Sequence, residues 1–160
     1  MKFDNLEYRK TLGKFVTGVT IITTCEKDGT PRGFTANSFT SVSLEPPMVL
    51  VCLGNKTGCI EAFTLGKRFV VNILKESQRT LSDMFAGPQK YKFKNQSYDI
   101  WNSDCPILSG CLVNIECIKV NIFEAGDHII LLGKVERIEH STSGRPLLYY
   151  KSKYVRIEDS

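Results

Sequence analysis

The alternation of apolar and polar positions predicts a chain made mostly of β-strands, with a short helix near its start. Residues 4–14 have the spacing of an amphipathic helix, and Asp4 is a candidate N-cap. One face of this helix is predicted to hold Leu6, Tyr8 or Arg9, Leu12 and Phe15.

After Gly18 the pattern becomes that of a β-hairpin. Residues 19–25 are rich in β-branched side chains, Asp28-Gly29 is a typical hairpin turn, and residues 32–43 are predicted to form one extended second arm. Pro46-Pro47 ends this arm, because proline cannot donate a ladder hydrogen bond.

The rest of the chain continues the same pattern of strands and turns. Residues 48–53 are apolar throughout and are followed by Gly54-Asn55, which predicts a buried, central strand. Further elements are predicted in this order: a helix at 60–65 ending at Gly66, a strand at 68–74, a helix at 77–85 before Gly87-Pro88, strands at 112–123 and 129–139 joined by 124–128 as a second hairpin, and a last short strand at 149–157. The predicted fold is therefore mainly β with short helices, an antiparallel closed sheet in one domain over residues 1–160.

The net charge and the hydropathy of the chain argue against a nucleic-acid-binding protein and against a membrane protein. The net charge is +4, which is less than a dedicated nucleic-acid binder carries but suits an anionic small ligand such as a phosphate. The first residues contain no apolar segment of signal-peptide length, and the longest apolar runs are too short to cross a bilayer. A cytoplasmic protein without a membrane partner is expected.

The six cysteines are predicted to be reduced thiols that bind no metal. A chain of 160 residues can build a full core without disulfides, and no C-x-x-C pair is present. Only two histidines are available to complete a metal site. Cys111 and Cys117 are an even number of residues apart in a predicted strand, so they are interpreted as small core residues on one face.

The uncharged segment Gly33–Ser43 is the strongest local sign of a ligand surface. It contains five hydroxyl side chains and one amide without a single charge. Neutral donors and acceptors suit a large, flat, partly polar molecule. The alternative is a Ser/Thr-rich edge strand whose hydroxyls are merely solvated.

Three segments together resemble the short-chain flavin reductases, the reductase partners of two-component flavin monooxygenases. The segments are Gly33–Leu44 with Pro46-Pro47, Phe69–Leu74, and Gly126-Asp127-His128 with Gly133; Pro146–Tyr150 is similar to the closing segment of that family. The resemblance covers about residues 12–154 and implies an FMN-binding split barrel. It further implies FMN (or FAD), NADH (or NADPH) as co-substrate, a homodimer and a possible monooxygenase partner.

By this resemblance, the flavin lies along residues 35–43 and the turn after the apolar strand. Ser41 and Ser43 are predicted to face one side at period two. The turn is predicted to lead into a helix start that receives phosphate beside Lys56, although such a lysine can also be simply solvated. The predicted cofactor-binding residues in these two segments are Thr35, Ala36, Asn37, Ser38, Ser41, Val42, Ser43, Cys52, Leu53, Asn55, Lys56 and Thr57.

Four further residues receive roles from the same resemblance. His128 is the predicted catalytic and cofactor-binding residue, orienting the nicotinamide, although a solvent-exposed turn histidine is the alternative. Lys92 is predicted to contact phosphate and Phe93 to pack, while a lysine-rich exposed loop remains the alternative. Tyr154 is predicted to cover the nicotinamide, or only to dock the last strand. His140 has no such context and is expected at the surface.

The favoured hypothesis is an NAD(P)H:flavin oxidoreductase, in which a hydride passes from nicotinamide C4 to flavin N5. The protein would bind and align the two cofactors and would need no nucleophile. No arginine cluster indicates a 2′-phosphate pocket, which favours NADH over NADPH. The alternatives are a non-enzymatic flavin- or haem-binding carrier or sensor, and nucleic-acid binding through the alternating cations and aromatics of Lys90–Lys94.

Overall fold

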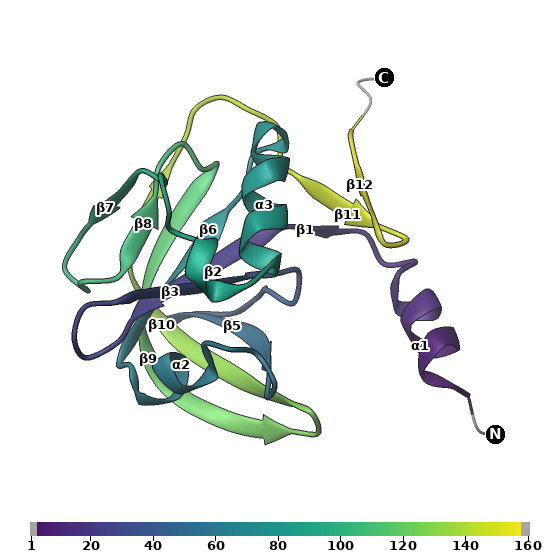
Figure 1. Cartoon of the computed structure of the whole chain (residues 1–160), viewed down its shortest axis with the longest axis horizontal. Helices are drawn as coiled ribbons and strands as arrows, with labels where there is room; N and C mark the ends of the chain where they lie inside the picture. The colour runs from purple at the N-terminus through teal and green to yellow at the C-terminus, as the bar shows by residue number, and fades with distance from the viewer. Residues whose placement is uncertain (1–2, 158–160) are drawn as a thin grey trace.

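The computed structural model describes residues 3–157, and these form a mainly β, antiparallel fold with short helices, as the sequence predicts (Figure 1). The helices are α1 Asn5–Leu12, α2 Ile60–Leu65 and α3 Arg79–Ala86, with the 3₁₀ turns η1 Glu76–Gln78 and η2 Gln89–Tyr91. The strands are β1 Thr17–Gly18, β2 Thr20–Cys25, β3 Pro31–Ala36, β4 Thr40–Leu44, β5 Pro47–Gly54, β6 Arg68–Ile73, β7 Tyr98–Ile100, β8 Pro106–Leu108, β9 Val113–Ala125, β10 His128–His140, β11 Leu148–Tyr150 and β12 Lys153–Val155.

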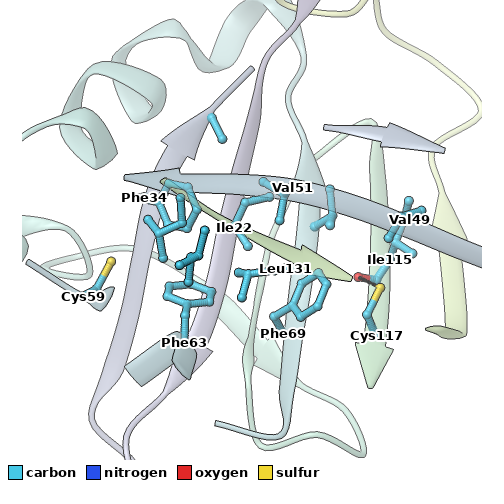
Figure 2. Close-up of a cluster of buried hydrophobic side chains, with 14 residues drawn as sticks. Ile22, Phe34, Val49, Val51, Cys59, Phe63, Phe69, Ile115, Cys117 and Leu131 are labelled. Carbon is cyan, nitrogen blue, oxygen red and sulfur yellow. Dashed lines mark hydrogen bonds between the residues drawn. The ribbon is translucent and has the colours of Figure 1, made fainter. Parts of the chain in front are cut away.

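Seven strands make the main sheet, in the order β3-β2-β6-β9-β10-β5-β4. The sheet curls around one interior, because Phe34 of β3 packs in the same buried cluster as Val49 and Val51 of β5, near the other edge (Figure 2). Two smaller sheets, β1-β11-β12 and β7-β8, complete the fold.

Strand β2 is buried on both faces because separate clusters cover each side. Ile22 points into the cluster inside the curled sheet, with Phe69 and Leu131 (Figure 2). Ile21 points to the opposite face, where it packs with Phe85 of α3. Because both faces of β2 are buried, its sequence is apolar and β-branched throughout and does not alternate with charged residues.

The predicted second arm, residues 32–43, is wrong as a single strand. The chain forms β3 beside β2, turns at residues 37–39, and then forms β4 beside β5 at the opposite edge of the sheet. The Ser38 hydroxyl fixes this corner by donating to the Cys52 carbonyl at 2.9 Å and accepting from the Cys52 N–H at 3.1 Å. A local pattern cannot show the corner, because both halves remain extended.

Other boundaries differ in smaller ways. β5 lies second from the edge instead of at the centre, and only alternate residues along it are buried. The predicted last strand, residues 149–157, is the hairpin β11–β12, with Lys151 and Ser152 at positive φ in its turn. The short strands β7 and β8 were not predicted.

The N-terminal helix forms as predicted, but it packs no face into the core. Asp4 caps α1 by accepting from the Glu7 N–H at 2.7 Å. None of the residues of α1 is buried, and the helix stands apart from the main sheet, beside the β11–β12 hairpin (Figure 1). Its contact with the rest of the chain includes a hydrogen bond from the Lys151 N–H to the Gly13 carbonyl, at 2.8 Å.

Asn72 joins β8 to the main sheet. Its Nδ2 donates to the Ile21 carbonyl at 2.9 Å and to Thr23 Oγ1 at 3.1 Å, and its Oδ1 accepts from the Leu108 N–H at 3.0 Å. Asn114 Nδ2 also donates to this oxygen, at 2.8 Å. The side chain is fully buried, so Asn72 of the Phe69–Leu74 segment has a structural role.

Candidate functional site

A cavity of about 400 Å³ brings together three of the predicted site residues. Thr35 approaches it from the end of β3, Thr57 from the turn after β5, and Lys92 from just beyond η2. Gly58 and Gln89 also line the cavity. The two residues are close to each other, because a Cβ placed on Gly58 would lie 3.6 Å from Gln89 Cγ. Segments far apart in the sequence therefore line one cavity with both polar and apolar walls.

Lys92 places a buried cation at this cavity. The residue is 3 % exposed, and its Nζ donates to the Gly33 carbonyl at 3.0 Å. Within residues 3–157 no carboxylate pairs with the ammonium group. Burial lowers the pKa of Lys92, and the nearby Cys59 thiol opposes this shift. A buried ammonium without an anionic partner is costly, so an anionic ligand group would be favoured here.

Gln89 was not predicted from the sequence. Its Nε2 also donates to the Gly33 carbonyl, at 3.0 Å, and its Oε1 is buried without a hydrogen-bond partner among residues 3–157. Residues three apart in a 3₁₀ turn lie on one side, which aligns Gln89 with Lys92. The three-residue spacing between Gln89 and Lys92 could have indicated a shared side from the sequence. It has this meaning only in a 3₁₀ turn, and the sequence pattern did not predict that turn. The cavity thus offers a cation and a free acceptor.

Thr35 and Tyr154 are connected through helix α3. Thr35 Oγ1 donates to the Ser82 carbonyl at 2.6 Å. The Tyr154 hydroxyl forms hydrogen bonds with Ser82 Oγ at 2.8 Å and Asp83 Oδ1 at 2.9 Å. Burial raises the pKa of Tyr154, and the neighbouring Asp83 carboxylate adds to this effect. Tyr154 lies beside the α3 wall but is not part of the cavity lining.

The remaining predicted residues of the uncharged segment are spread over the corner and over β4. Ala36 is buried, and its carbonyl accepts from Thr20 Oγ1 at 2.8 Å, while Asn37 is exposed. Ser38 holds the corner through Cys52, so its hydroxyl is already engaged. Of the corner residues Ala36, Asn37 and Ser38, only Asn37 is exposed.

The prediction that Ser41 and Ser43 face the same side is wrong. A bulge in the β4–β5 ladder skips Val42, so Ser41 lies opposite Val49 and Ser43 lies opposite Met48. Val49 and Met48 are adjacent residues of β5 and face opposite sides of the sheet.

The turn after β5 differs from the predicted helix start. Helix α2 begins only at Ile60, so the amides of residues 55–57 are not at its N-terminus. Asn55 ties the turn to the β9–β10 hairpin, with its N–H 2.9 Å from the Asp127 carbonyl. Lys56 is exposed. The prediction for Leu53 is wrong for its side chain, which is 1 % exposed and lies in the core.

His128 is the first residue of β10 and lies opposite Gly54. Its Nδ1 is 2.7 Å from Asp127 Oδ1, and this hydrogen bond lowers the pKa of Asp127. A Cβ placed on Gly54 would lie 3.6 Å from His128 Nε2 and 3.5 Å from Thr57 Oγ1. Because Thr57 lines the cavity, the exposed imidazole stands near the rim.

The alternation of cations and aromatics at Lys90–Lys94 does not form one surface. Lys92 is buried, while Lys90 and Tyr91 are exposed and stack on each other at 4.7 Å. Phe93 packs edge-on between Phe85 and Tyr98, at centroid distances of 4.9 and 5.7 Å. The prediction that Phe93 packs is confirmed, and a continuous nucleic-acid surface is not present in this segment. His140 is exposed, as expected.

Comparison with known proteins identifies the family. The model of the flavin reductase-like domain matches residues 12–158. The chain belongs to this family. It is 43 % identical to a probable flavin reductase of Rhizobium meliloti, over 87 % of this chain and 45 % of that protein. It is 36 % identical to a flavin-dependent monooxygenase reductase subunit of Mycobacterium tuberculosis, over 98 % of this chain and 84 % of the subunit.

Solved structures of the family have the same fold. An NADH:FAD oxidoreductase of Streptomyces globisporus, in complex with NAD and FAD fragments, aligns with a TM-score of 0.91 and 33 % identity, over 97 % of this chain and 93 % of that chain. The chain spans about half the length of the first curated relatives, 45 % and 47 % of them.

Two further observations concern membranes and metals. No helix within residues 3–157 has the length and apolar character needed to span a bilayer. Over the same residues, no three His, Cys, Asp or Glu side chains are grouped so that they could hold a metal ion.

Proposed function

We propose that the protein is an NAD(P)H-dependent flavin reductase. The observation that carries this proposal is the convergence of Thr35, Thr57 and a buried, carboxylate-free Lys92 on one cavity, in a chain of the flavin reductase-like family. Relatives named as an NADH-dependent flavin reductase and as monooxygenase reductase subunits support the reaction and an acceptor monooxygenase. FMN or FAD would accept a hydride at N5 from the nicotinamide C4.

The flavin phosphate is proposed to lie between Thr57 and Lys92. The Lys92 ammonium would donate to the phosphate, and Lys56 would add positive charge at the exposed rim. The corner backbone at Ala36, Asn37 and Ser38 would hold the polar edge of the flavin ring. The proposed site also takes in the β4 residues Ser41, Val42 and Ser43, with Cys52, Asn55 and Phe93 as supporting contacts.

His128 is proposed to orient the nicotinamide. Its hydrogen bond to Asp127 fixes the imidazole through Nδ1, which leaves Nε2 directed toward the Gly54–Thr57 side. Tyr154 of β12, which is held beside α3 by Ser82 and Asp83, is proposed to cover the same cofactor. NADH is favoured as the hydride donor. A relative named as an NADH-dependent flavin reductase supports this preference.

Replacing His128 with alanine is expected to raise the KM for NADH about tenfold, with little change in the KM for FMN. The loss of one oriented hydrogen bond at the nicotinamide explains the asymmetry. Steady-state kinetics with each substrate varied separately measure it. His140→Ala, at the exposed far end of β10, is the matched control. An equal rise in both KM values would contradict the role of His128.

The activity itself is tested by the anaerobic rate of FMN bleaching by NADH, with and without the purified protein. Acceleration well above the uncatalysed rate is expected. Repeating the assay with FAD and NADPH determines the preference for each cofactor. Flavin binding without acceleration would contradict the reductase and would support a carrier or sensor.

A homodimer and a cytoplasmic location complete the proposal. The helix α1 leaves its apolar residues uncovered, and Phe15 and Leu44 are 77 % and 95 % exposed. We therefore propose that a second copy of the chain covers these apolar residues. The six free thiols support a reducing compartment.

Phe15→Glu is expected to weaken self-association at least tenfold (an order-of-magnitude estimate), because a charge would be buried in the interface. Sedimentation velocity over a range of protein concentrations measures the effect. Thr11→Glu introduces the same charge at a polar, exposed position of α1 and is expected to leave the dimer largely intact. A wild-type protein that sediments only as a monomer would contradict the homodimer.

A further inference from the structure

A second cavity, of about 640 Å³, contains none of the predicted site residues. It lies between the end of β2 with its following turn, the last turn of α2, the start of β6, and residues 102–105. Its wall holds two of the six free cysteines, Cys25 and Cys105.

Cys25 and Cys105 are far apart in sequence but adjacent in the fold. Cys25 ends β2, and Cys105 immediately precedes β8. Cys25 packs against the small buried cluster of Val70, Cys105 and Ile107, and both cysteines line the same cavity. Cys105 is 1 % exposed, whereas Cys25 is partly open to the cavity.

The surroundings of Cys105 hold its sulfur in place. Its thiol lies 3.5 Å from the Arg68 carbonyl and 3.4 Å from the Ser103 carbonyl. Thr24 Oγ1, on the neighbouring residue to Cys25, is 3.9 Å from the same sulfur. The fold therefore places one buried thiol and one partly exposed thiol in the same cluster and at the same cavity.

We infer that Cys25 and Cys105 form an oxidisable dithiol, a site at which a peroxide converts two thiols to a disulfide. Cys25, which faces the cavity, attacks the peroxide as its thiolate, so the O–O bond breaks and Cys25 sulfenic acid and water form. The Cys105 sulfur then attacks the Cys25 sulfur, the S–O bond breaks, and a second water leaves. The dithiol loses two electrons and two protons, and the peroxide is reduced to two waters.

The chemistry of the pair sets the order and the speed of these steps. Burial raises the pKa of Cys25, and the neighbouring Cys105 thiol opposes the rise. Burial also raises the pKa of Cys105, to about 11. Cys25 is therefore the more readily ionised of the two, and oxidation at neutral pH is slow and requires excess peroxide. Reduced flavin produces hydrogen peroxide with dioxygen, but the inference itself does not depend on the proposed reductase function.

The test is peptide mapping of the full chain after treatment with excess hydrogen peroxide, followed by alkylation of the free thiols under denaturing conditions. A linked Cys25–Cys105 peptide that disappears after reduction is expected. It should be absent in Cys25→Ser and present in Cys52→Ser, which removes another partly exposed thiol. Absence of the linked peptide in the wild-type protein, or accumulation of Cys25 sulfinic acid in its place, would overturn the inference.

A second probe uses the untreated protein and no oxidant. Phenylarsine oxide bridges two neighbouring thiols and resists displacement by a monothiol. One retained equivalent per chain is expected, and its loss in Cys25→Ser would assign it to this pair. Retention that is unchanged in Cys25→Ser, or no retention in the wild-type protein, would contradict the adjacency of the two thiols. Neither measurement requires bound flavin or activity, so failure of the proposed function would leave this test intact.

Discussion

Lys92→Met is expected to weaken FMN binding by about tenfold to a hundredfold without destabilising the ligand-free protein. A hydrogen bond from a charged donor contributes roughly 1.5–3 kcal/mol, which corresponds to this range of affinity. Methionine has a similar length and is neutral, so it removes the charge while still filling the buried space. The Gly33 carbonyl keeps two other donors, Gln89 Nε2 and the Cys59 thiol.

The stability of the ligand-free protein distinguishes a binding role from a structural one. Burial lowers the pKa of Lys92 below its ordinary value of 10.5. Below the lowered pKa both the folded and the unfolded chain carry this charge, and the folded chain bears the cost of burying it. That cost is relieved as pH rises from the folded pKa toward 10.5, because the unfolded state then binds more protons. Lys92→Met removes the cost at neutral pH, so its Tm should equal or exceed that of the wild type.

Fluorescence titration with FMN and with riboflavin, together with thermal denaturation, measures both effects. Riboflavin lacks the phosphate, so the substitution should weaken FMN binding much more than riboflavin binding. Lys90→Met, on the exposed side of the same turn, is the matched control and should change FMN affinity only slightly. A lower Tm for Lys92→Met, or equal losses for both ligands, would contradict a phosphate contact.

Gly133→Ala is expected to destabilise the fold by about 1–3 kcal/mol, toward the upper end of the usual cost of overpacking. A Cβ at this position would lie 2.4 Å from Phe69 Cζ and 3.0 Å from Cys117 Cβ. Phe69 is 1 % exposed and is enclosed by the cluster inside the curled sheet, so its ring has little room to move (Figure 2). The glycine is thus required by close packing of β10 against the Phe69 ring.

Thermal denaturation measures this second effect. For a domain of this size, the expected destabilisation lowers Tm by about 2–12 °C. Gly18→Ala is the matched control, because a Cβ there would meet nothing within 4 Å and Gly18 has no positive φ. A Tm for Gly133→Ala within error of that of Gly18→Ala would show that the Phe69 ring can move aside.

Local patterns were sufficient where neighbouring residues alone decide the conformation. Asp4 caps α1, helix α2 covers Ile60–Leu65 as predicted, and the Gly66 N–H donates to the Ala62 carbonyl at 2.8 Å at its end. The β9–β10 hairpin was also predicted, since long β-branched segments flank a turn at Gly126, which has positive φ. In these cases the short-range hydrogen bonds are encoded within a few residues.

The order and spacing of three uncharged or glycine-containing segments also indicated the family, and with it the fold and the general region of the site. Thr35, Thr57, Lys92 and His128 were named from the sequence, and they lie on or near one cavity. The assignments of Leu53 and of a common face for Ser41 and Ser43 failed, because core burial and a β-bulge depend on which strand lies alongside.

Contacts between distant segments decided the rest. The sequence pattern is extended on both sides of Ser38, but its bonds to Cys52 move the chain from one edge of the sheet to the other. Lys92 is one of several lysines in its segment, and only the approach of Gly33 and Gln89 makes it a buried cation at a cavity. Cys25 and Cys105 likewise meet only in the fold. Periodicity and composition define which residues favour strands, helices and turns, whereas burial, charge pairing and thiol adjacency depend on long-range packing that no local pattern contains.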